Sequence, residues 1–244
     1  MTNFINLAKL YGLKKLLKFS LLEIRSLIYR IIYKSYSQHK EDLIIEKIIG
    51  KKKLGKYIDV GANDPVRFNN TYKFYKSGWS GINVEPNINK YKNLKSMRSR
   101  DINLNIAISN MSESVEFYSF VPDTLSTISG MVAKHYQDMG FTYLSVCTVV
   151  CSTLAEITHL AEIDGEYDIL TIDTEGSELE ILKTNLWSKY KPYVVCVETV
   201  NFDNNQDQII HNIDIINYML NCKYKIYKQT KTNTIFVRHD IKSS

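Results

Sequence analysis

Two carboxylates stand at the ends of two apolar segments in the first half of this chain. Asp59 lies near the end of the run Tyr-Ile-Asp-Val-Gly, and Glu85 ends the run Gly-Ile-Asn-Val-Glu. Both runs are typical of buried parallel strands. Since the carboxyl ends of adjacent parallel strands line one ligand crevice, the first acid can meet an ammonium group and the second a ribose diol. S-adenosylmethionine carries both of these groups.

Three short blocks then give the chain a resemblance to a known family. They are Asp-Val-Gly-Ala-Asn at residues 59–63, Glu-Pro at 85–86 and Ile-Asp-Thr-Glu-Gly-Ser-Glu at 172–178. In this order they resemble the signature blocks of the FkbM family of S-adenosylmethionine-dependent methyltransferases, and the resemblance spans residues 38–200. Pro65 departs from the family's usual glycine and removes an N–H that a bound carboxylate could use. A dinucleotide site is disfavoured because the glycines that approach a pyrophosphate are missing.

The resemblance implies positions for the methyl donor. Asp59 is expected to meet the methionine ammonium, the backbone of Gly61 and Ala62 to meet the carboxylate end, and Glu85 to meet the ribose hydroxyls. Three further residues are assigned to the same cofactor site, the last two beside the adenine: Asn63, Asn105 and Ala107.

The third block carries the residues expected to act on the acceptor. Methyl transfer to an oxygen requires alignment at about 3 Å and a group that takes the hydroxyl proton. Asp173 ends a predicted strand and Glu175 lies in the following turn, so Asp173 is expected to orient the acceptor or act as the base. A divalent metal such as magnesium, held with Glu175 or Glu198, is the less favoured alternative. His135 is a second candidate base.

Composition and charge limit the class of protein. The 244 residues suit one α/β domain, and the four cysteines form no C-x-x-C pair, so reduced thiols are expected and a zinc site is not. Residues 1–36 contain seven basic side chains and one acidic, a net charge of +6, whereas residues 37–244 have a net charge of −1. A nucleic-acid partner is disfavoured because such proteins place basic surface around their site.

Residues 7–32 read as a basic amphipathic helix, with apolar residues at steps of three and four. Charges interrupt every apolar run, so neither a transmembrane span nor a signal peptide is expected. Two alternatives remain open. The helix packs on the domain or on a second copy of the chain, or it lies on an anionic membrane surface. Both keep the protein in the cytoplasm, the second at the inner face of the membrane.

The resemblance implies a class I methyltransferase fold for residues 37–244. This is a Rossmann-like α/β sheet of seven mostly parallel strands, with an antiparallel closing hairpin and helices on both faces. Hydrophobic patterns predict strands at 57–60, 81–85, 102–108, 168–172, 193–198, 224–227 and 234–237. Helices are predicted at 41–49, where the helix would cover the site's opening, at 68–76, at 87–97, from Ser177 with a Ser177–Glu180 capping box, and at 207–220.

Residues 109–166 form an insert between the two halves of the sheet, longer than a simple crossover requires. It is expected to hold strands at 115–120 and 143–150, a polar loop at 122–130 and a helix at 154–163. Long loops at a ligand-facing edge carry function, so the insert is assigned to the acceptor.

The expected activity is O-methylation of a hydroxyl, with a sugar of a cell-surface glycan or glycolipid as the acceptor. The acceptor class comes from what the family often methylates. O-methylation of a small secondary metabolite such as a polyketide is the rival within enzymes. A non-catalytic module that binds S-adenosylmethionine is the rival outside them, and the presence of Asp59, Glu85 and Asp173 together argues against it.

Overall fold

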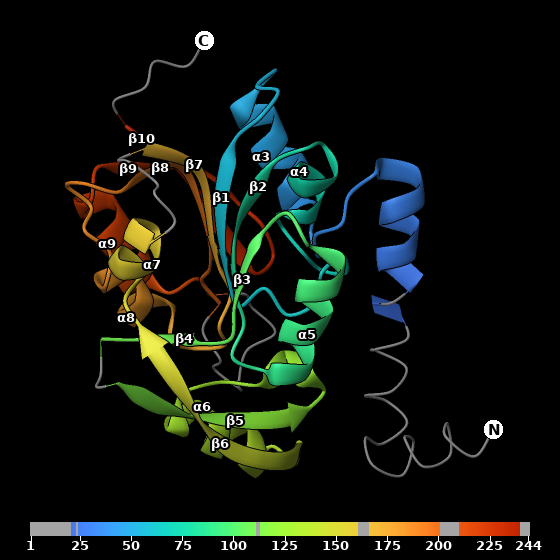
Figure 1. The fold of residues 1–244 in the computed structure, drawn as a ribbon, viewed down its shortest axis with the longest axis vertical. Coiled ribbons are helices and arrows are strands. Elements are labelled where there is room, and N and C mark those ends of the chain that lie inside the picture. The colour runs from blue at the N-terminus through green and yellow to red at the C-terminus, as the bar shows by residue number, and fades with distance from the viewer. Residues whose placement is uncertain (1–20, 23, 111–112, 161–165, 201–209, 240–244) are drawn as a thin grey trace.

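The computed structural model describes residues 21–22, 24–110, 113–160, 166–200 and 210–239 (Figure 1). Its centre is a seven-stranded sheet with the order β3-β2-β1-β7-β8-β10-β9, which confirms the predicted sheet. The strands are β1 (Lys56–Val60), β2 (Ser80–Val84), β3 (Ile102–Leu104), β7 (Glu166–Ile172), β8 (Lys191–Glu198), β9 (Tyr224–Gln229) and β10 (Asn233–Arg238).

The central strands are parallel and buried, as near-continuous apolar runs require. β1 pairs in parallel with β2 and with β7, and β7 pairs in parallel with β8. β10 is antiparallel to both β8 and β9, so the closing hairpin is confirmed. Because β1, β2, β7 and β8 run in one direction, their carboxyl ends meet at a single edge of the sheet.

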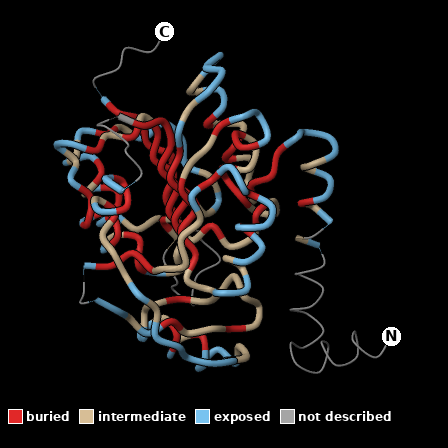
Figure 2. The backbone as a smooth tube through the Cα atoms, in the orientation of Figure 1, coloured by how far each residue is buried: buried red, intermediate tan, exposed pale blue. Residues whose placement is uncertain are grey.

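Helices cover both faces of the sheet, and the buried residues concentrate in its middle (Figure 2). On one face, α3 (Glu41–Ile49) and α4 (Tyr72–Lys76) contribute Ile45 and Phe74 to a core with Trp79. The other face is covered by α7 (Leu154–Leu160), α8 (Glu178–Lys183) and α9 (Ile213–Asn221). α5 (Ile88–Met97) begins at Asn87, whose side chain accepts two backbone N–H groups of its first turn.

The expected helix 68–76 is shorter, beginning at Tyr72. Phe68 has a left-handed backbone with φ of 55°. The amide oxygen of Asn69 accepts the N–H groups of Thr71 and Tyr72, which satisfies donors at the start of a helix. Residues 61–71 are consequently a loop, and Pro65 lies within it rather than in a first helical turn.

The predicted strand 102–108 is broken in two. β3 pairs with β2, whereas β4 (Ala107–Ile108) pairs with β6 (Thr142–Ser152) in a second sheet. The break occurs at Asn105, whose side-chain amide donates to the carbonyls of Glu85 and Pro86 at 2.9 and 2.8 Å. This side chain thus replaces ladder hydrogen bonds where the chain leaves the main sheet.

The insert folds as a three-stranded sheet with the order β4-β6-β5, backed by a helix. β5 (Ser114–Val121) and β6 form an antiparallel pair that matches the two predicted strands. The expected polar loop at 122–130 instead contains the short 3-10 helix η2 (Asp123–Leu125), and α6 (Gly130–Asp138), which was not predicted, follows it. Phe120, Ala133 and Tyr136 form a small separate core beneath this sheet.

Most of the predicted helix at 7–32 lies outside the described residues. The described part, residues 21–22 and 24–28 followed by the π-helix η1 (Tyr29–Tyr33), is helical and is called the leader helix below. α3 spans the predicted residues but packs on the sheet face through Ile45, and no described residue of α3 lines the cavity introduced next. Within the described ranges, no helix has the length and apolar character needed to cross a membrane.

Candidate active site

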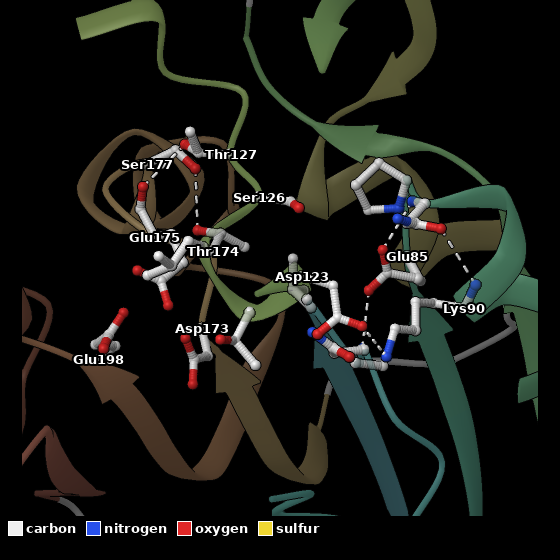
Figure 3. Close-up of a pocket in the computed structure, with 18 of the residues that line it drawn as sticks. Glu85, Lys90, Asp123, Ser126, Thr127, Asp173, Thr174, Glu175, Ser177 and Glu198 are labelled. Atoms are coloured by element: carbon white, nitrogen blue, oxygen red, sulfur yellow. Dashed lines mark hydrogen bonds and ion pairs between the residues drawn. The ribbon is translucent and has the colours of Figure 1, made fainter. Parts of the chain in front are cut away.

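A cavity of about 460 Å³ opens at the carboxyl edge of the parallel strands, between the main sheet and the insert (Figure 3). Its volume is in the range of small-molecule sites. The wall combines strand ends, the loop after β1 and the insert, and includes Gly61, Ala62, Asn63, Glu85, Ala107, Asp123, Thr127, Asp173, Glu175 and Glu198.

The turn after β1 depends on Gly61, which has a φ of 79°. A Cβ atom at this position would lie 1.8 Å from the carbonyl oxygen of Asp173, so only glycine fits between the ends of β1 and β7. The N–H groups of Gly61 and Ala62 both donate to the carbonyl of Val84, at 3.0 and 3.2 Å. Both amides are thus used inside the protein, which differs from the expected role of holding the ligand's carboxylate.

Asp59 is not among the described residues that line the cavity. Its carboxylate is buried behind the loop, where it accepts hydrogen bonds from the Thr71 hydroxyl at 2.7 Å and the Asn69 amide at 3.1 Å. Arg98, which is fully buried, donates to Thr71 and to the carbonyl of Pro65. The structure therefore places Asp59 as a support of the loop, and its direct contact with an ammonium group stays a prediction.

Glu85 lies in the cavity wall and is anchored by the backbone. Its two carboxylate oxygens accept the N–H groups of Asn63 and Asn87, at 2.8 and 2.7 Å. Burial raises the pKa of Glu85 to about 7, against the lowering effect of these two hydrogen bonds. Asn63, with φ of 47°, has a buried amide oxygen that finds no hydrogen-bond partner among the described residues. A cationic ligand group would satisfy this oxygen.

The other two predicted cofactor residues differ in position. Ala107 is buried and lines the cavity, as expected. Asn105 is absent from the described cavity wall and holds the backbone of residues 85–86 instead. An unpredicted ion pair joins Lys90 of α5 to Asp123 of the insert (Figure 3). Both residues line the cavity, so this pair links the donor side to the insert.

Three carboxylates meet at the other end of the cavity. Asp173, Glu175 and Glu198 each offer an oxygen within 4.8 Å of the others (Figure 3). Burial, followed by the charge of Glu178, raises the pKa of Asp173 to about 7. Burial and the charge of Asp173 raise the pKa values of Glu175 and Glu198 well above the ordinary range. Three crowded carboxylates cannot all be ionised together, so Asp173 is the member that ionises near neutral pH.

The Asp173 and Glu198 carboxylates offer oxygens within 4.8 Å of each other. This proximity sharpens the difference, because it lowers the pKa of Asp173 through a shared proton and raises that of Glu198. Glu198 therefore favours its protonated form more strongly than Asp173 does. From the sequence, Glu198 is a possible metal ligand. Its neighbour in space, Asp173, comes from a different strand, and only the parallel pairing of β7 with β8 brings them together.

The turn after β7 is held by Glu178. Its carboxylate accepts the N–H groups of Thr174 and Gly176 at 2.9 and 3.1 Å, which fixes Glu175 between them in a left-handed conformation with φ of 57°. The predicted Ser177–Glu180 capping box is wrong. The Ser177 side chain makes no capping hydrogen bond. The Glu180 carboxylate pairs with Lys183.

The insert reaches the acids through Tyr136 rather than His135. The buried Tyr136 hydroxyl donates to Oε2 of Glu175 at 2.6 Å, and Thr127 donates to the Glu175 carbonyl at 2.9 Å. His135 is half-buried on α6 and is not among the described residues that line the cavity. The helical step between the two residues explains the difference, since neighbours on a helix point about 100° apart. No sequence signal marked α6, which explains why Tyr136 was missed.

The three acids are also the one group of potential metal ligands among the described residues. Oxygen ligands suit magnesium or calcium. The same three side chains could therefore bind a divalent cation or hold protons, and the arrangement by itself is compatible with both.

A mostly parallel seven-stranded sheet with an antiparallel closing pair, helices on both faces and a cavity at its carboxyl edge defines the class I S-adenosylmethionine-dependent methyltransferase fold. Among solved structures, the chain is similar to two methyltransferases. A TehB-like methyltransferase from Corynebacterium glutamicum has 6% identity and a TM-score of 0.41, covering 81% of this chain and 87% of its own. The METTL16 methyltransferase domain has 11% identity and a TM-score of 0.48, covering 88% and 78%.

The profile of the methyltransferase FkbM domain matches residues 59–226, and the chain belongs to this family. It is thus an S-adenosylmethionine-dependent methyltransferase. None of the curated proteins matches the chain.

Proposed function

We propose that the protein transfers the methyl group to a hydroxyl, and that this hydroxyl belongs to a sugar of a glycan or glycolipid. The observation that carries the proposal is the acid cluster in the cavity wall. An alcohol acceptor must lose a proton as it gains a methyl group, whereas many other acceptors need no strong base. A carboxylate with a pKa of about 7, beside two neutral acids, suits this task.

The donor end of the cavity fits S-adenosylmethionine. The unpartnered Asn63 amide oxygen suits the methionine ammonium, and the free lone pairs of the Glu85 carboxylate suit the ribose diol. Ala107 provides an apolar wall. When bound, S-adenosylmethionine would supply an electrophilic methyl group.

At the acid end, Asp173 is the proposed base. It accepts the acceptor's proton as the hydroxyl oxygen receives the methyl group. Glu198 lies beside Asp173, and the Tyr136 hydroxyl holds Glu175 through its hydrogen bond. The insert supplies four polar residues that can hydrogen-bond to a polyhydroxylated acceptor, Asp123, Thr124, Ser126 and Thr127, together with the apolar Phe117, Pro122, Leu125 and Ile128.

The test uses purified protein, radiolabelled methyl donor and fractionated lipid and polysaccharide extracts. Transfer of label to a sugar as an alkali-stable ether supports the proposal, and label confined to small apolar metabolites supports the polyketide alternative. Donor binding without transfer to any fraction identifies a non-catalytic module. Adding a chelator distinguishes metal binding by the three acids from proton transfer by Asp173. If activity is lost with chelator and restored by magnesium, the acids are metal ligands.

A further inference from the structure

The leader helix turns its apolar side away from the protein. Leu21, Ile24, Ile28 and Ile31 are 65%, 55%, 43% and 62% exposed. Their spacing of three and four residues places them on one face of the helix. Leu27 and Ile32 beside them are also exposed, so the stripe is continuous.

The opposite, more polar face lies against the domain. The guanidinium of Arg25 donates to the carbonyl of Gln38 at 3.3 Å, and Ser26 is buried. The ammonium of Lys40 lies over the rings of Tyr29 and Tyr33, 4.6 and 3.4 Å from their centroids. A surface helix that packs on its own domain normally buries its apolar face. This helix does the reverse, which disfavours the alternative that it serves only as a packed helix of its own domain.

A buried cluster of hydrogen bonds next to the leader helix fixes the orientation of the stripe. The Asp42 carboxylate accepts hydrogen bonds from the Ser35 hydroxyl at 2.5 Å, the Tyr36 N–H at 2.6 Å and the Ser37 hydroxyl at 2.8 Å. Leu22, which precedes this cluster in the sequence, and Gln38, which lies within it, both line the main cavity. The stripe and the cavity are therefore parts of one region of the molecule. Figure 1 shows the leader helix in blue on the α4 and α5 side of the domain.

Charge indicates what covers the stripe. Residues 1–36 carry a net charge of +6 and the rest of the chain −1. Two leader segments brought together in a dimer would repel each other, whereas an anionic lipid surface attracts basic residues and accepts leucine and isoleucine at its acyl boundary. An apolar stripe in a segment of net charge +6 matches the lipid surface on both counts.

We propose that the leader helix seats the cavity on an anionic membrane surface, so that the acceptor is an amphiphile whose hydroxylated headgroup reaches the cavity from the bilayer. The catalytic half of this statement rests on the proposed function; the membrane half does not. A glycolipid held in the bilayer would meet the enzyme at the side where Leu22 borders the cavity.

The experiment compares the full chain with two double variants. Ile24→Ser/Ile31→Ser removes two stripe residues, and the control Leu54→Ser/Leu186→Ser removes two residues of similar exposure, 66% and 55%, elsewhere on the surface. Each protein is sedimented with phosphatidylcholine vesicles that contain or lack phosphatidylglycerol, at low and high salt. We expect binding of the full chain only to anionic vesicles, weakened by salt, and a loss of about tenfold or more in the stripe variant alone.

Light scattering and calorimetry with S-adenosylmethionine accompany the sedimentation. The membrane proposal is overturned if the full chain does not bind anionic vesicles. It is also overturned if the stripe variant binds them as well as the control variant does. Loss of a dimer in the stripe variant without any vesicle binding would instead identify a second copy as the occupant.

The turnover assay separates the two proposals. Glycolipid fractions in vesicles should be methylated faster than the same fractions in detergent. This rate advantage should be seen only with proteins that retain the stripe. Faster turnover in detergent overturns membrane presentation of the acceptor. Absence of any transfer, with vesicle binding intact, counts against the proposed O-methylation and leaves the membrane surface standing.

Discussion

The two ends of the cavity are built from the same kind of residue in opposite ways. At the donor end, both oxygens of Glu85 accept backbone N–H groups, and the nearby Asp123 carboxylate is paired with Lys90. At the acid end, Asp173, Glu175 and Glu198 face one another. Burial raises the pKa at both ends, but only crowding separates the members of a cluster into charged and neutral partners. The donor end is thus suited to binding the methyl donor, and the acid end is suited to accepting a proton.

The largest effect is expected from Asp173→Asn, which keeps the shape of the side chain and abolishes its basicity. Turnover should fall by about 10²–10⁴-fold, the usual contribution of general-base catalysis. Donor affinity should change by less than about twofold, because Asp173 lies at the far end from Glu85. Single-turnover kinetics and calorimetry measure the two quantities, with the exposed Asp138→Asn as control. Near-normal turnover in Asp173→Asn would show that Asp173 is not the base and that the two ends of the cavity do not differ in this way.

Glu85→Gln should have the converse effect, weakening the binding of S-adenosylmethionine by about 1–3 kcal/mol while leaving turnover at saturating donor close to normal. Calorimetry and a donor titration of the rate test this. Asp59→Asn serves as a comparison, since its carboxylate supports Thr71 and Asn69 behind the loop. Its main effect should be a lower melting temperature. If Asp59→Asn alone weakened binding at unchanged stability, the predicted direct contact with the ammonium would be restored.

Tyr136→Phe should reduce turnover by about fivefold to thirtyfold, equivalent to 1–2 kcal/mol for one lost hydrogen bond to Glu175. The neighbouring His135→Ala should stay within about twofold of the wild type. Both are measured under saturating donor, with thermal melts to check folding. A severe loss of turnover in His135→Ala, together with a mild loss in Tyr136→Phe, would identify His135 as the base.

The smallest expected effect is on stability as a function of pH. The pKa of Asp173 is raised from 3.8 to about 7, so the folded protein binds more protons than the unfolded chain between these values. The contribution of Asp173 to stability should therefore fall as the pH rises through this window and level off above about pH 7. Asp173→Asn should flatten the slope of melting temperature against pH, and Glu85→Gln should do so for its own shift. Identical slopes in all three proteins would contradict the raised values.

The sequence by itself determined the fold and the family, because those depend on local patterns. Continuous apolar runs specify buried parallel strands, and the glycine at position 61 permits the turn after β1, which has a φ of 79°. The boundaries of α3 and the strand ends at Val60 and Glu198 were predictable in this way. Glu85, Asp173 and Glu175 follow from position in a block, and each reaches the cavity wall.

Tertiary structure alone decided which groups satisfy one another. Asp59 and Glu85 look equivalent in the sequence, yet the backbone turn at Gly61 leaves one behind the loop and the other in the wall. The pKa values of Asp173 and Glu198 are separated because two strands distant in the chain are neighbours in the sheet. Tyr136 reaches Glu175 by packing of a helix that no local pattern marked. Burial and charge coupling act through space, and a sequence records only neighbours along the chain.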